Sequence, residues 1–243
     1  MCGRKSYNSI DFALIKPGFI EQNNKSSLPI RSYWIPSSNS GIVDSIMQYS
    51  FRLGKINAWL KLSNNDPESF PYSLELKRKS DGKLLAAGPI FKDEIFNFVL
   101  TADSDKLTNW KKKKSRYVYI LGINNRGDIS LLFPRPKYNM EKLMYPVDIQ
   151  NSTSIINIDY SGFSIGSPYG FDTYILITSD SQIPNPIGLE QSGVQDSRSV
   201  SKDMNTNPLG RLLFSYGSKT RGDDVTISSN WSMQRLIIES KEK

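Results

Sequence analysis

Acidic side chains offer the main route to catalysis that this sequence leaves open. Glycosidases need only two carboxyl groups at a fixed separation, one of them acting as a general acid. Asp159 and Asp172 flank a glycine-rich segment and form the better candidate pair. The pairs Asp93–Glu94 and Asp223–Asp224 are adjacent in sequence, and neighbours on a strand point to opposite faces. Since aspartates near turns often accept backbone N–H groups, we expect structural roles here and keep a carboxylate-pair glycoside hydrolase as an alternative.

Other familiar catalytic groups are missing. The chain of 243 residues contains no histidine, which excludes Ser-His-Asp triads, Cys-His dyads and histidine–zinc sites within it. Its single cysteine, Cys2, can form no intrachain disulfide and no thiolate cluster. A calcium loop of the D-x-D-x-D-G type is also absent. We therefore predict a protein that is not an enzyme and has no catalytic residue, metal or cofactor.

A basic run suggests an anionic partner. The formal net charge is +7, and five cations occur close together, namely Lys111, Lys112, Lys113, Lys114 and Arg116. Nucleic-acid-binding surfaces combine such charge with exposed aromatic rings. Here Tyr117 and Tyr119 are in register with apolar residues, which indicates a buried face. We predict a solvated loop before a core strand, and nucleic-acid or anionic-surface binding through residues 111–116 stays an alternative.

The segment GFSIGSPYGF, residues 162–171, is the most unusual stretch of the chain. Three glycines and one proline within it predict a fixed loop whose backbone packs closely against its surroundings. The order of a phosphate-binding loop, with its trailing lysine, is absent. The segment is either a structural loop or one wall of a peptide or ligand groove, and Gly166 and Tyr169 are candidate partner contacts.

Short segments rich in aromatic and branched residues must position these groups. Four of them predict strands, at residues 46–62, 72–80, 83–91 and 94–102. Asp81-Gly82 between the second and third predicts a tight hairpin. Residues 117–123 are apolar on both faces, as in a covered strand, and the turn Asn124–Asp128 leads to the strand ISLLF. This turn contains an Arg-Gly-Asp triplet, which we interpret as turn chemistry and not as an adhesion motif.

Further strands are expected at residues 153–162 and 172–180 and near the end of the chain. One amphipathic helix is predicted after Asn207, with Pro208 at its first position and Gly217 after its end. Residues 1–45 contain three prolines among polar residues and suggest an arm or linker. We predict an all-β, antiparallel β-sandwich at 46–243 with one short helix and an irregular N-terminal arm. We expect no membrane span, and the lack of a leader pattern favours a cytoplasmic location.

Three segments together resemble a bacterial family of domains of unknown function. They are RYVYILGINNRGDISLLFP, SPYGFDTYILITSD and NWSMQRLIIES. Members of that family sit behind caspase-like peptidase, protein-kinase-like or repeat modules. The resemblance implies an accessory β-sandwich without catalytic residues, at the C-terminal end of a multidomain protein. The expected function is therefore a non-catalytic interaction module that binds protein or glycan, with another protein or a preceding module as partner.

Overall fold

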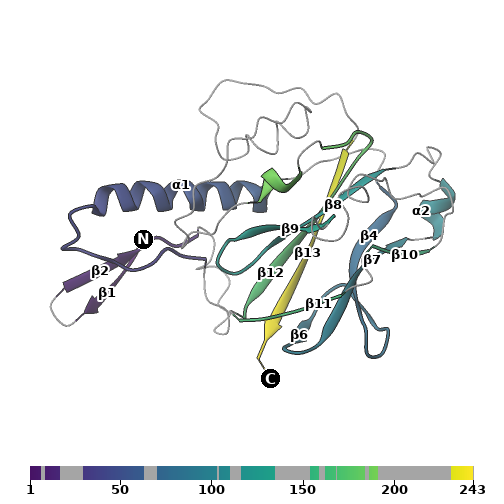
Figure 1. Cartoon of the computed structure of the whole chain (residues 1–243), viewed down its shortest axis with the longest axis horizontal. Helices are drawn as coiled ribbons and strands as arrows, with labels where there is room; N and C mark the ends of the chain where they lie inside the picture. The colour runs from purple at the N-terminus through teal and green to yellow at the C-terminus, as the bar shows by residue number, and fades with distance from the viewer. Residues whose placement is uncertain are drawn as a thin grey trace.

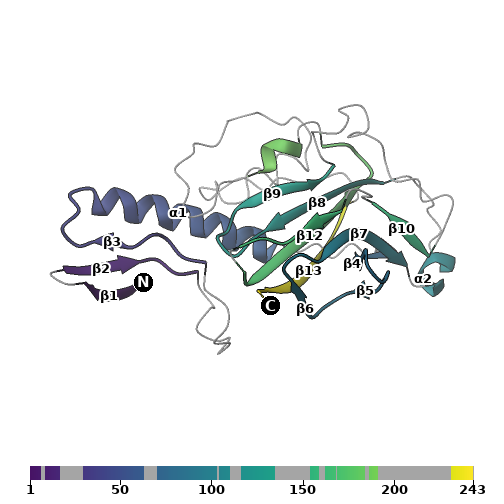
Figure 2. The same ribbon diagram turned by 60° about the horizontal axis from the view of Figure 1, so that its bottom comes forward.

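Two five-stranded sheets packed face to face form the centre of the molecule (Figure 1). The computed structural model describes residues 1–6, 9–16, 30–62, 70–102, 104–109, 116–134, 154–158, 162–167, 169–183, 186–190 and 231–242. The predicted all-β sandwich is confirmed. A helix covers the outer face of one sheet, so three layers follow one another, as the turned view in Figure 2 shows.

The first sheet has the strand order β6-β13-β12-β8-β9. Its strands are β6 (Pro89–Phe91), β8 (Tyr117–Ile123), β9 (Ile129–Phe133), β12 (Phe171–Ser179) and β13 (Trp231–Lys241). All neighbours are antiparallel except β13 and β6, which pair in parallel. The predicted strand at 117–123 thus lies between two others, with the return strand ISLLF beside it.

The second sheet has the order β10-β7-β4-β5, with β11 also paired to β7. Its strands are β4 (Tyr72–Arg78), β5 (Leu84–Leu85), β7 (Ile95–Ala102), β10 (Ile155–Asn157) and β11 (Phe163–Ser164). The predicted hairpin at Asp81-Gly82 is confirmed, because β4 and β5 are antiparallel neighbours and Gly82 has a φ of 71°.

Alternation along β8 sends its side chains into two separate cores. Val118 and Ile120 face the second sheet and pack with residues such as Phe98 of β7. Tyr119 and Leu121 face the opposite way and pack against the helix α1 (Ile42–Lys61). The strand is therefore covered on both faces, as its sequence predicts. The helix covers its tyrosine-bearing face, where Tyr119 is buried and Tyr117 partly buried.

The prediction of a strand at residues 46–62 is wrong, because this segment belongs to α1. Leu53, Ile56 and Trp59 recur at helical spacing and are buried against the first sheet. At 20 residues the element is far longer than a typical strand. The guanidinium of Arg235 in β13 donates to the carbonyl of Leu62, which satisfies one acceptor at the end of the helix.

The described part of the N-terminal arm contains regular structure. Strands β1 (Cys2–Ser6), β2 (Ser9–Ala13) and β3 (Ile35–Pro36) form a small antiparallel sheet. This sheet lies beside the N-terminal half of α1, away from the two larger sheets (Figures 1 and 2). Because α1 begins at Ile42, the predicted boundary at residue 45 falls inside a helix.

Two short helical elements complete the described chain, α2 (Ser104–Asn109) and the 3₁₀ helix η3 (Pro186–Leu189). The helix predicted after Asn207 lies outside the described residues. No helix in the described ranges is both long and apolar enough to cross a lipid bilayer.

Candidate ligand pocket

The tight turn between β8 and β9 is organised by the side chain of Asn124. Its Oδ1 accepts the backbone N–H groups of Arg126 and Asp128 at 2.9 and 3.0 Å, and its Nδ2 donates to Oδ2 of Asp128 at 2.8 Å. Gly127 has a φ of 81°, and a Cβ there would overlap the side chain of Ile56 in α1. The Arg-Gly-Asp triplet is thus a turn packed against the helix, and Asp128 is held at the start of β9.

A second aspartate is fixed at the start of β12. Gly170 has a φ of 155°, and a Cβ there would lie 2.9 Å from Nδ2 of Asn125, so glycine permits a close approach of the two segments. In this arrangement Nδ2 of Asn125 donates to the carbonyl of Tyr169 at 2.6 Å, and the Gly170 N–H donates to the Ser240 hydroxyl at 3.0 Å. These bonds anchor the chain immediately before Asp172.

Strand register brings the two aspartates to the same end of the sheet. Thr173 pairs with Ile123, and Ile123 pairs with Ile129. Asp172 directly precedes Thr173, and Asp128 directly precedes Ile129. The two aspartates therefore lie near the beginnings of β12 and β9, on either side of Ile123. Asp172 shares a face with Tyr174, which is part of the core between the sheets.

The glycine-rich segment supplies the opposite wall. Phe163 in β11 stacks on Phe98 of β7 with ring centroids 4.6 Å apart. It also lies 5.9 Å from the ring of Tyr174, so aromatic rings from both sheets meet at this point. Gly162, with a φ of 76°, allows the chain to enter β11 close to Asn97 and Ile95.

A pocket of about 210 Å³, open to solvent, lies between these walls. For comparison, a cavity of about 150 Å³ can hold benzene, so this volume suffices for one substituted six-membered ring. A Cβ on Gly122 would lie 2.7 Å from Cδ1 of Leu132, so glycine at this position lets the Leu132 side chain pack directly on the strand at the pocket wall. The pocket is lined by Gly122, Ile123, Asn124, Asp128, Ser130, Leu132, Phe163, Ser164, Ile165, Gly166, Ser167, Asp172 and Tyr174.

Burial shapes the electrostatics of the pocket. It raises the pKa of Asp172 to about 6, against the opposing effect of hydrogen bonds from the Ser240 hydroxyl and the Asn125 backbone N–H. Burial, and then the negative charge of Asp172, also raise the pKa of Tyr174, whose phenol is therefore neutral. A carboxylate kept in such surroundings is costly, and perturbed groups of this kind cluster at functional sites.

Of the residues predicted to contact a partner, the structure describes Arg116, Gly166 and Tyr169. Gly166 is exposed and lines the pocket, whereas Tyr169 contributes the carbonyl that accepts Asn125 and does not line it. Arg116 is only 4 % exposed, so its placement argues against a role in a surface for anions. Lys111, Lys112, Lys113 and Lys114 lie outside the described residues, as do Asp159 and the pair Asp223–Asp224.

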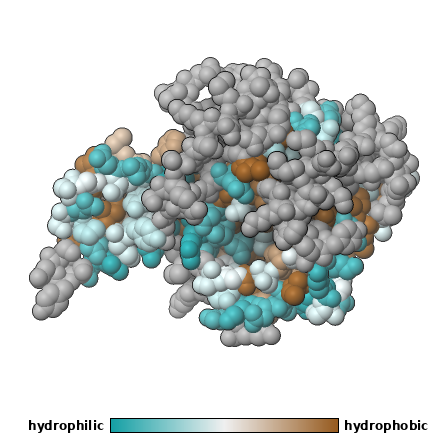
Figure 3. Space-filling view, viewed as in Figure 1, coloured by the Kyte–Doolittle hydropathy of each residue, from teal (hydrophilic) through white to brown (hydrophobic). Residues whose placement is uncertain are grey.

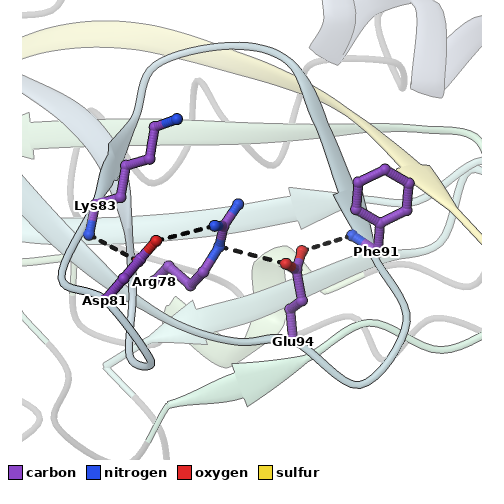
Figure 4. A network of polar contacts seen from close by, with 5 residues as sticks. All are labelled: Arg78, Asp81, Lys83, Phe91 and Glu94. Carbon is purple, nitrogen blue, oxygen red and sulfur yellow. Dashed lines mark hydrogen bonds and ion pairs between the residues drawn. The ribbon is translucent and has the colours of Figure 1, made fainter. Parts of the chain in front are cut away.

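Within the pair Asp93–Glu94, Glu94 has a structural role, which Figure 4 shows. Glu94 accepts the Phe91 N–H at 2.9 Å and forms an ion pair with Nε of Arg78 at 3.4 Å. Nη1 of Arg78 also donates to Asp81 at 3.1 Å, and Asp81 accepts the Lys83 N–H. The bond from Lys83, together with the charge of Arg78, lowers the pKa of Asp81. This network joins two turns and offers no paired acids for catalysis.

Sequence reasoning missed most of the pocket. The sequence pairs Asp172 with Asp159 and assigns Asp128 to a turn. It does not indicate Phe163, Ser164 or Tyr174 as ligand contacts. The available signal is the i, i+2 spacing of Asp172 and Tyr174, which places them on one face of a strand over residues 171–179. Nothing in the sequence shows that β11 lies opposite that face.

Other features of the described chain point less clearly to a site. No group of three or more acidic or cysteine side chains is placed to hold a metal ion within the described ranges. On the face seen in Figure 3, the described apolar residues are scattered among polar ones and form no single broad patch. Comparisons with protein-family models, curated proteins and solved structures found no match. The resemblance to the bacterial accessory domains therefore stays a prediction.

Proposed function

We propose that the protein is a non-enzymatic binding module whose pocket receives one sugar ring of a glycan. The observation that carries this proposal is the composition of the pocket, in which two aromatic rings, two carboxylates and several hydroxyl groups surround about 210 Å³. The C–H groups of a sugar ring pack on aromatic rings, while its hydroxyls donate to carboxylates. A few convergent polar groups in an otherwise apolar pocket are typical of ligand sites.

Rigid positioning supports binding at this place. The two aspartates lie at the ends of two strands that flank β8. Asn124 donates to Asp128, and Asn125 donates to the carbonyl of Tyr169, three residues before Asp172. Phe163 is held by its stacking on Phe98. A site whose groups are already in place loses little side-chain entropy when a ligand arrives, which favours affinity.

A titration with monosaccharides, followed by amide NMR shifts, tests the proposal. We expect shifts confined to residues around the pocket. Gly166→Trp should block binding, because Gly166 lines the pocket and no atom lies within 4 Å of a Cβ placed there. The matched control is Gly54→Trp on α1, where a Cβ is equally unhindered. Binding that survives Gly166→Trp, or no binding of any sugar by the native protein, would contradict the proposal.

A carboxylate-pair hydrolase is the second candidate, because Asp128 and Asp172 line one pocket. Glycosidases use two carboxyl groups in one cleft, and their general acid has a raised pKa, as Asp172 has. We rank it lower because Oδ2 of Asp128 is occupied by Asn124, and Asp172 accepts hydrogen bonds from Ser240 and Asn125. Release of phenol from aryl glycosides that disappears in Asp172→Asn would establish hydrolysis and replace the binding-module proposal.

A further inference from the structure

The charge of the pocket opposes that of the whole chain. The protein has a formal net charge of +7, yet the pocket contains two aspartates and no lysine or arginine among its described lining residues. An anionic ligand would meet like charge in a partly dehydrated site, which is strongly unfavourable. The local charge therefore selects against uronic acids, phosphates and other anions, in contrast to what the overall charge suggests.

Within the described part of the chain, the groups that donate hydrogen bonds to the Asp172 carboxylate are neutral. The groups that lower its pKa by hydrogen bonding are the Ser240 hydroxyl and the Asn125 backbone N–H, and both are neutral. A buried carboxylate is far better compensated by a cation that also donates hydrogen bonds than by neutral donors alone. A ligand cation in the pocket would supply that compensation.

Aromatic rings add a second attraction for a cation. Phe163 and Tyr174 both line the pocket, and their ring centroids are 5.9 Å apart. The negative faces of such rings attract ammonium groups, most strongly where water is excluded. Carboxylates and aromatic rings at one place together favour an amine over a hydroxyl of the same size.

Resting on the saccharide-binding function above, we propose that the pocket prefers a ring bearing a protonated amine, such as a 2-amino sugar, to its neutral and acidic counterparts. The ammonium lies by Asp172, the ring packs on Tyr174 and Phe163, and the remaining hydroxyls reach the serine and asparagine side chains of the rim. No bond is made or broken, so the inference concerns recognition alone.

Matched ligands at pH 7.5 test this by calorimetry. Glucosamine is compared with glucose and glucuronate, and galactosamine with galactose and galacturonate. We expect the amino sugar to bind about tenfold more tightly than the hexose, since a charge-assisted hydrogen bond replaces a neutral one. The uronic acid should bind more weakly than either. Cyclohexylamine, cyclohexanol and cyclohexanecarboxylate repeat the series without sugar hydroxyls.

Variants assign the preference to the pocket. Asp172→Asn should reduce the preference for the amine about tenfold, because it removes the charge and keeps the shape. Asp180→Asn is the control, because Asp180 is exposed just beyond the opposite end of β12 and should leave the preference unchanged. A preference that survives Asp172→Asn overturns the role given to that residue.

The outcomes separate the two proposals. Equal binding of hexose and amino sugar overturns the amine inference and leaves saccharide binding intact. Binding of cyclohexylamine over cyclohexanol without binding of any sugar supports the amine inference and overturns the saccharide function. Failure of all nine ligands to bind overturns both.

Discussion

Replacing Asp172 by asparagine should stabilise the protein at neutral pH. Burial raises the pKa of this carboxyl from 3.8 to about 6. Each pKa unit corresponds to about 1.4 kcal/mol, so the ionised group lowers the free energy of unfolding by about 3 kcal/mol. Asparagine keeps the shape and one acceptor oxygen for Ser240 and Asn125 while removing the charge. The variant should recover much of this energy, on the order of 1–3 kcal/mol.

The effect must depend on pH in one direction. An acid whose pKa is raised by folding binds its proton more tightly in the folded state, so the native protein loses stability as pH rises from about 4 through about 6. Well below pH 3.8 both states carry the proton, and aspartic acid and asparagine are then equivalent in charge. The stabilisation by Asp172→Asn should therefore be small at pH 4 and complete above pH 7.

Urea unfolding of the native protein and Asp172→Asn, at pH values from 4 to 8, measures this difference. The matched control Asp180→Asn changes an exposed aspartate just beyond the other end of the same strand and should shift stability by less than about 0.5 kcal/mol. A destabilising Asp172→Asn, or a stabilisation that is the same at pH 4 and pH 8, would refute the burial of an ionised carboxylate at this position.

Two further predictions test the packing that positions the pocket. Gly127→Ala should destabilise the fold by about 1–3 kcal/mol, because its φ of 81° is strained for alanine and the new Cβ overlaps Ile56. At Gly54 the new Cβ meets open space within α1, so Gly54→Ala should raise the free energy of unfolding by about 1 kcal/mol. Changes of the same sign for the two substitutions would contradict this assignment. Tyr119→Phe should cost about 1–3 kcal/mol in thermal or urea unfolding, because the buried Ile183 N–H donates to the Tyr119 hydroxyl at 2.8 Å; an unchanged stability would show that this N–H finds another partner.

The architecture could be predicted where the local pattern is strong. Alternation in residues 117–123 correctly placed Val118 and Tyr119 on opposite, covered faces, and Asp81-Gly82 correctly marked a hairpin. The segment 46–62 was misread because its aromatic and branched residues favour strands, although Leu53, Ile56 and Trp59 follow a helical period. The length of the segment, well beyond that of a typical strand, argues for a helix instead.

The pocket could be predicted only in part, because it depends on contacts between distant segments. The glycine-rich segment was recognised as a possible groove wall, and Gly166 does line the pocket. The union of Asp172 with Asp128 follows from the pairing of β12, β8 and β9, and that register is set by tertiary structure. The position of Phe163 depends on the pairing of β11 with β7. A strand of only two residues has no sequence pattern from which this pairing could be predicted.

The most direct test of the pocket as a ligand site is a crystal structure of the protein soaked with the amino sugar that binds most tightly. We expect the ring to lie against Tyr174 and Phe163, with its amine within hydrogen-bonding distance of Asp172. A sugar bound elsewhere on the surface, or an amine directed away from Asp172 into solvent, would contradict the account.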